Sequence, residues 1–166
     1  MHHDDHVAHH AMHDHAQQAQ AAATLNKVAL WATVHCLSGC AVGEVLGMVI
    51  GTAISLSNLA VIVLSTVLAF VFGYAFTVVP LLRTGMAPRA AAAIALASDT
   101  ASIAVMEVVD NLVMLVVPGA MDAALDTVLF WGALAMSLAL AGVAAYPVNR
   151  FLIARGKGHA LVHSSH

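Results

Sequence analysis

The residues best suited to chemistry in this chain lie within its apolar segments. In the stretch HCLSGCAVGEVLGM, Cys36, Cys40, Glu44 and Met48 recur at every fourth position, and His35 borders the row. Residues four apart lie on the same face of an α-helix. The spacing therefore predicts one helical face that carries thiol, carboxylate and thioether groups beside an imidazole.

A second stretch, DTASIAVMEVVDNLVM, carries polar groups that also favour one side of a helix. Counting about 1.5 Å of rise per residue from the expected helix starts puts Asp99 level with the two thiols. The same count puts Met106 and the later carboxyl groups level with Glu44, so we expect two facing helices to share one polar column. The polar side of this stretch comprises Asp99, Met106, Glu107, Asp110, Asn111 and Met114.

The composition indicates that a lipid bilayer surrounds these residues. The chain is 61% hydrophobic and only 9% charged, whereas a soluble domain of this size needs many more charges on its surface. No charged residue occurs between Glu44 and Arg83 or between Asp126 and Arg150, and an uncharged stretch of about 18 residues suffices to span hydrocarbon. We therefore predict an all-α integral membrane protein, a four-helix bundle.

Turn and capping residues give the expected boundaries. Pro88 fits the first turn of the third helix, where its missing amide hydrogen costs nothing, and Asp122 or Asp126 is expected to cap the fourth. We expect a flexible tail rich in His and Asp over 1–24, a membrane domain over 25–155 with spans at about 25–53, 58–82, 88–117 and 127–151, and a histidine-containing tail over 156–166.

The basic residues predict the orientation. With four spans, every Lys and Arg falls on one side of the membrane, and the positive-inside rule makes that side cytoplasmic. Both termini are then cytoplasmic in a multi-pass protein of the bacterial inner membrane. The basic residues are Lys27, Arg83, Arg89, Arg150, Arg155 and Lys157.

Glycines at every fourth position of the first helix, from Gly39 to Gly51, predict a flat strip where another backbone approaches closely. The strip suits either ordinary packing within the chain or a contact between subunits. Because four helices make a thin protein, we expect a homo-oligomer or an accessory to a larger membrane complex.

A metal ion is one way to compensate the buried acids. An ionised carboxylate near the bilayer centre costs at least about 3 kcal/mol, and no basic residue lies at that depth, which leaves protonation, water or a metal. Thiolate, imidazole and thioether groups suit copper above all, and zinc or iron are possible. The predicted metal ligands are His35, Cys36, Cys40, Glu44, Asp99, Met106, Glu107 and Asp110. The alternative is that the cysteines and methionines are packing residues and that His35 bonds between helices.

Histidines also crowd both ends of the chain. The N-terminal group, mixed with aspartates, resembles a metal-collecting tail, although an artefact or a solubilising tail has a similar composition. The histidines are His2, His3, His6, His9, His10, His13 and His15 at one end and His159, His163 and His166 at the other.

The motif from His35 to Cys40, read His-Cys-x-x-Gly-Cys, followed by Gly43-Glu44, resembles an uncharacterised bacterial membrane-protein family known only as a domain of unknown function. Met106-Glu107 with Asp110-Asn111, and the segment 147–150, belong to the same resemblance. It covers the chain from about residue 28 to the C-terminal histidines. The resemblance implies a small membrane protein and supplies no substrate.

These observations favour a transition-metal binding or transport protein, with copper the favoured ion and the histidine tails feeding an intramembrane site. The alternative is a proton or cation channel or transporter that uses the acidic column. A redox pair of Cys36 and Cys40 ranks lowest, because four residues of helix strain a direct disulfide, and His35 alone is weak support for haem. We expect no enzyme activity, no catalytic residues and no binding of nucleic acid.

Overall fold

The computed structural model describes residues 4–155, with side chains from Gln17 onward. This part of the chain forms four helices, and each contains a stretch long and apolar enough to cross a bilayer, Gln17–Ala53 in the first. The prediction of an all-α chain with four long apolar helices is confirmed, and the fold is that expected of a multi-pass membrane protein. The helices are α1 (Asp4–Ala53), α2 (Asn58–Arg83), α3 (Pro88–Val116) and α4 (Val128–Ala154).

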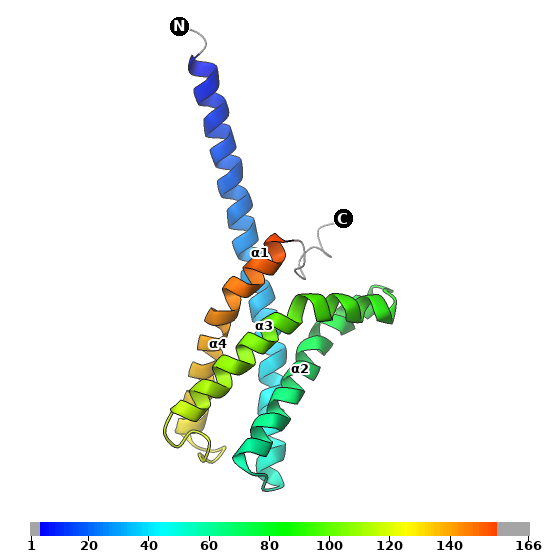
Figure 1. The fold of residues 1–166 in the computed structure, drawn as a ribbon, viewed down its shortest axis with the longest axis vertical. Helices are drawn as coiled ribbons and strands as arrows, with labels where there is room; N and C mark the ends of the chain where they lie inside the picture. The colour runs from blue at the N-terminus through cyan, green and yellow to red at the C-terminus, as the bar shows by residue number, and fades with distance from the viewer. Residues whose placement is uncertain (1–3, 156–166) are drawn as a thin grey trace.

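The start of α1 differs from the prediction. The segment expected to be a flexible tail over 1–24 is helical from Asp4 onward. Its second half, AQQAQAAA, consists of good helix formers and runs into the apolar segment without a Gly or Pro to stop it. Figure 1 shows α1 projecting well beyond the other helices. The metal-collecting role expected for the histidines of both tails falls on residues or side chains outside the described part.

Local chemistry explains the helix starts. Pro88 is the first residue of α3, as predicted. The cap of α4 is Thr127 rather than either aspartate, because its hydroxyl accepts a hydrogen bond from the backbone amide of Phe130 at 3.3 Å. Asp126 lies one residue too early to do this, and Asp122 accepts a hydrogen bond from Asn58 instead.

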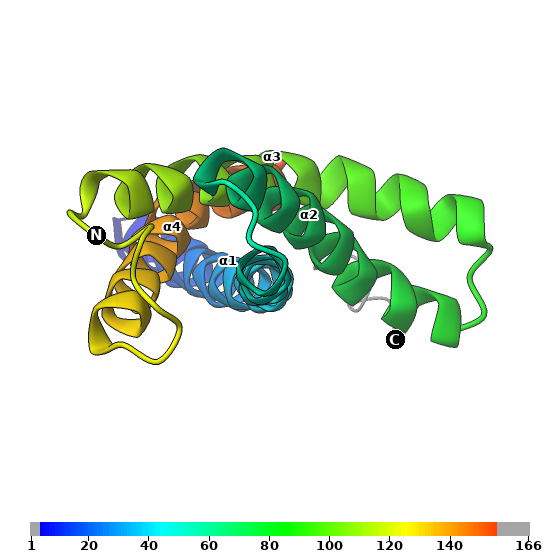
Figure 2. The same ribbon diagram turned by 90° about the horizontal axis from the view of Figure 1, so that it is seen from below.

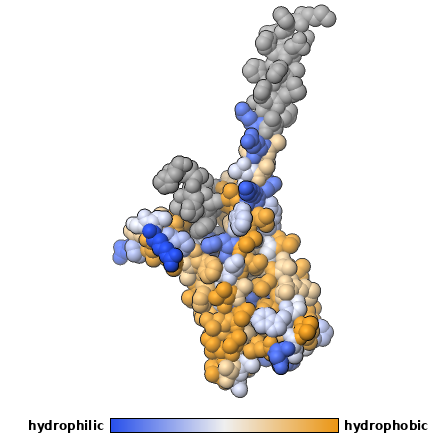
Figure 3. Space-filling view, turned by 180° about the vertical axis from the view of Figure 1, so that it is seen from behind, coloured by the Kyte–Doolittle hydropathy of each residue, from blue (hydrophilic) through white to orange (hydrophobic). Residues whose placement is uncertain are grey.

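The helices run up and down, so their connections alternate between two ends. Figure 1 places the connections over 54–57 and 117–127 at one end, which we call the loop end. The turn over 84–87 and the end of α4 lie at the other, where α1 projects; we call this the basic end, because the described Lys and Arg residues belong to it. Hydrophilic side chains gather there in Figure 3, and apolar ones cover the bundle.

Close packing joins α1 to α2. A Cβ atom added to Gly43 would lie 2.3 Å from the carbonyl oxygen of Leu68, and one added to Gly47 would lie 2.4 Å from the Cα atom of Ser65. Backbone therefore meets backbone along the glycine strip, which confirms packing within the chain as its role. Figure 2 shows that α2 and α3 lean away from α1 and α4 toward the turn that joins them.

Candidate functional site

Four carboxyl groups are buried in the interior between α1 and α3. Glu44, Asp99, Glu107 and Asp110 are each no more than 5% exposed. No Lys or Arg is among the buried residues of the described chain. The carboxyl groups must therefore be compensated by neutral groups, by protons or by a cation.

Asp99 occupies the level nearest the basic end, as its expected depth predicted. The thiol of Cys36 is within hydrogen-bonding reach of Asp99 and of the Ser102 hydroxyl. Ser98 donates a hydrogen bond to Asp99 Oδ1 at 2.6 Å. Hydroxyl and thiol groups thus lie beside this carboxyl group.

A small cavity adjoins Asp99 on the side of the basic end. It measures about 10 Å³ and is lined by His35, Cys36, Asp99 and Asn149 among others. A space of this size holds about one water molecule. Asn149, from α4, also donates a hydrogen bond to Thr33 on α1 at 2.9 Å, which draws the two helices together beside the cavity.

The middle of the column is formed by Cys40 and Glu107. The Cys40 thiol lies near the carboxyl groups of Glu107, Glu44 and Asp99. Both cysteines are buried, and they form no disulfide with each other. Met106 packs against the two cysteines, one level nearer the basic end than expected. A helical side chain points back toward the start of its helix, which for α3 is the basic end.

Glu107 also connects α2 to the column. Its carboxyl group is within hydrogen-bonding reach of the Thr66 hydroxyl. The Asn111 side chain donates to the same hydroxyl at 3.2 Å and to the backbone oxygen of Glu107 at 2.8 Å. One polar group from α2 thus meets two from α3.

Glu44 and Asp110 form a pair of contacting acids, which we call the carboxyl pair. Their side chains are within hydrogen-bonding reach of each other, and Glu44 Oε2 and Asp110 Oδ2 receive no hydrogen bond. Ser137, from α4, donates to Asp110 Oδ1. Because two contacting carboxylates repel strongly, they cannot both be ionised unless a proton or a cation lies between them.

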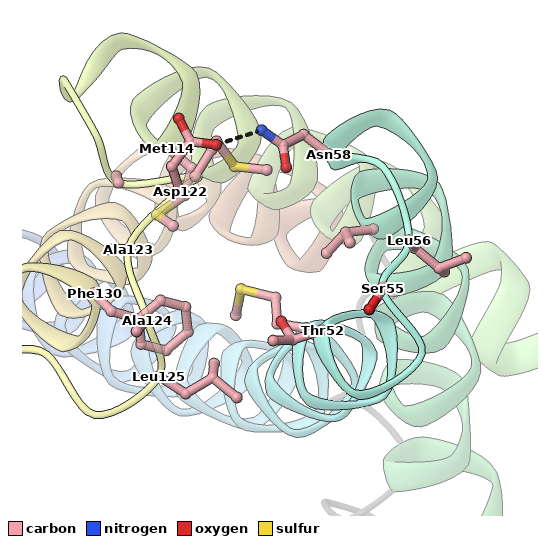
Figure 4. A pocket seen from close by; sticks show the side chains of 14 residues that line it. Thr52, Ser55, Leu56, Asn58, Met114, Asp122, Ala123, Ala124, Leu125 and Phe130 are labelled. Atoms are coloured by element: carbon pink, nitrogen blue, oxygen red, sulfur yellow. Dashed lines mark hydrogen bonds between the residues drawn. The ribbon is translucent and has the colours of Figure 1, made fainter.

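A larger cavity, which we call the vestibule, lies at the loop end. Its volume is about 390 Å³. Exposed Thr52, Asn58 and Asp122 belong to its rim, and buried Met48 and Met114 to its inner wall. Figure 4 shows the vestibule between α1, the start of α2 and the loop that leads to α4, with the Asn58–Asp122 hydrogen bond of 2.9 Å across one side.

The inner wall of the vestibule lies one helical turn from the carboxyl pair. Met48 follows Glu44 by four residues on α1, and Met114 follows Asp110 by four residues on α3. One helical turn, a rise of about 6 Å, therefore separates each thioether from a carboxyl group. The polar column connects a wide cavity at one end of the bundle to a cavity for a single water near the other.

The eight predicted ligands do not gather at one point. No three His, Cys, Asp or Glu side chains within the described residues come together as a group that could hold a metal ion. Instead they follow one another along the bundle, with His35, Cys36 and Asp99 nearest the basic end and the carboxyl pair nearest the loop end. Sequence reasoning missed the hydroxyl and amide groups beside them. Ser98, Ser137 and Thr66 lie next to carboxyl groups, Ser102 lies near Cys36 and Asn149 lines the small cavity.

A family model matches residues 25–158 of the chain. The chain belongs to the DUF4396 family. DUF4396 is described as a domain of unknown function, which agrees with the resemblance seen in the sequence. No curated protein and no solved structure matches the chain. The DUF4396 match contains the whole polar column and the vestibule, and the histidines of both tails lie outside it.

Proposed function

We propose that this DUF4396 protein carries protons across a membrane, alone or in exchange for a cation, along its column of buried acids. The observation that supports this proposal most is the carboxyl pair of Glu44 and Asp110, which has no basic partner and lies one turn from a cavity open at the loop end. A pair that holds one proton changes charge when it gains or loses one, which a purely structural acid has no need to do.

In this proposal, protons pass between the vestibule and the carboxyl pair, and then along Glu107 and Asp99. The thiols of Cys36 and Cys40 lie between these acids, so that polar groups continue along the column from one acid to the next. Hydroxyl groups suit the task because each can donate to a carboxylate or accept from a protonated acid. The single-water cavity beside Asp99 is the tightest point of the route.

The proposed setting is a bacterial inner membrane, with the basic end and both termini on the cytoplasmic side and the vestibule on the opposite side. A homo-oligomer, or attachment to a larger membrane complex, is part of the same proposal. In either arrangement each chain contains its own column.

Proton flux into liposomes tests the proposal. Purified full-length protein is reconstituted with a pH-sensitive dye inside, and a potassium diffusion potential drives protons inward. We expect Glu44→Gln and Asp110→Asn each to lower the flux by roughly tenfold or more, because neither amide can release a proton. Asp126→Asn, in the loop outside the column, is the matched control and should retain the wild-type flux. Equal flux in all four proteins refutes the proposal.

A second candidate is the transition-metal function that the sequence favoured, with copper preferred over zinc or iron. One observation supports it: His35, Cys36 and Asp99, three common types of metal ligand, line the same small cavity. It ranks second because they form no metal-binding group as they stand in the described part of the chain.

A further inference from the structure

Three methionines from different parts of the fold meet at the vestibule. Met48 comes from α1, Met114 from α3 and Met121 from the loop that leads to α4. Of the eight methionines in the chain, Met1 and Met12 lie outside the described side chains. Three of the other six thus line one cavity.

The vestibule methionines pack within the bundle and also border a cavity. Met48 and Met114 are 7% and 3% exposed and belong to buried clusters, as Met106 does at 1%. They differ from Met106 because they also line an open space of about 390 Å³, and Figure 4 shows thioether sulfur atoms among the groups around it. Met136, on α4, is 47% exposed and lines no part of it.

The donors in the vestibule suit a soft ion. Thioethers are neutral, polarizable ligands that favour Cu(I) and the chemically similar Ag(I). A hard divalent ion such as Ca²⁺ takes about six to eight oxygen ligands. Among the described residues that line the vestibule, Asp122 is the one acid, and it already accepts a hydrogen bond from Asn58. Methionine's flexible side chain lets the sulfur atoms close around an ion.

We propose that the vestibule is the loading site for a soft monovalent metal cation, bound by the thioethers of Met48, Met114 and Met121. Binding displaces water from the ion, and no electron is transferred. The onward step rests on the proposed function: the carboxyl pair lies one helical turn inward from Met48 and Met114 and is the next polar site along the route.

Methionine-methyl NMR of the full chain tests the loading site. The protein carries a ¹³C label on its methionine methyl groups and is titrated in detergent with Ag⁺, which does not change its oxidation state. We expect the signals of Met48, Met114 and Met121 to shift and saturate together, while those of Met106 and Met136 stay in place. Silver bound by the N-terminal histidines would shift the signals of Met1 and Met12, which stand among them in the sequence, and these two signals are read separately.

Substitution of methionine by leucine tests the site, with one methionine outside the vestibule as the control. Met48→Leu with Met114→Leu keeps the side-chain volume, removes two sulfur atoms, and should weaken the silver-induced shift of Met121 by at least roughly tenfold in Kd. Met136→Leu should leave it unchanged. The proposal is overturned if the three vestibule signals of the wild type do not move, or if all described methionines shift alike.

Failure of this inference can be told apart from failure of the proposed function. Proton flux is measured without silver. The Glu44→Gln protein should lose flux and keep the silver-induced shifts. Shifts without flux in the wild type would therefore leave the loading site standing and refute the proton route, and flux without shifts would do the reverse.

Discussion

At the level of residues, hydroxyl groups rather than Lys or Arg contact the buried acids in the described part of the chain. Ser98 donates to Asp99, and Ser137 donates to Asp110. A hydroxyl group can reverse its hydrogen bond when the acid gains a proton, whereas Lys or Arg would hold the acid ionised. The choice of partners thus agrees with acids that change protonation during function.

The cysteines give a prediction that separates the two candidate functions. If a metal ion binds at the thiols, the full-length Cys36→Ser/Cys40→Ser protein should bind about one copper or zinc ion fewer per chain than the wild type. Elemental analysis after reconstitution under reducing conditions measures this difference, and the histidine tails contribute equally to both proteins. Equal metal content contradicts a metal at the thiols and leaves proton flux as the property to explain.

The polar residues of α1 and α3 could be predicted from the sequence, and those of α4 could not. The rows on α1 and α3 were predictable because their polar groups repeat with the period of a helix. Ser137 and Asn149 were not, because each is a single polar residue in the apolar α4 and no periodic companion marks its face. Their roles depend on how α4 packs against α1 and α3. The periodicity of residues within one helix gives no information about this packing.

At the level of elements, the α1–α2 contact places the column. Backbone approaches backbone along the glycine strip, which fixes the rotation of α1 and so turns the row of Cys36, Cys40 and Glu44 toward α3. The turn residue Pro88 and the long uncharged stretches made the helices predictable. The sequence does not predict the helical start of α1, because a mixture of histidines and aspartates is typical of a flexible tail.

Gly43→Ala should therefore destabilise the bundle. The new methyl group would lie 2.3 Å from the Leu68 carbonyl oxygen, and forcing the two backbones apart costs about 1–3 kcal/mol. Denaturation in detergent measures the free energy of unfolding. Gly132→Ala is the control, since nothing lies within 4 Å of its added Cβ atom and alanine favours a helix over glycine by about 0.5–1 kcal/mol. Equal stability of the two variants would contradict the close contact.

At the level of the whole molecule, the two ends of the column differ. The vestibule of about 390 Å³ lies at the loop end, and the space near the basic end measures about 10 Å³. Transport by alternating access needs a second state in which the narrow end widens. Figures 1 and 2 show α2 and α3 leaning away from α1 and α4 toward the turn at the basic end.

The positions of the basic residues and of the vestibule predict which introduced cysteines a thiol reagent reaches from outside a cell. Thr52 lines the vestibule and is exposed, so Thr52→Cys should react with a membrane-impermeant maleimide on intact cells. Thr84→Cys, in the turn at the basic end, should react only after the membrane is permeabilised, because the positive-inside rule places that end in the cytoplasm. The wild type supplies the background, since Cys36 and Cys40 are 3% and 1% exposed. The reverse pattern would place the vestibule on the cytoplasmic side, so that any cation bound by its methionines would be loaded from the cytoplasm and the direction of exchange would be inverted.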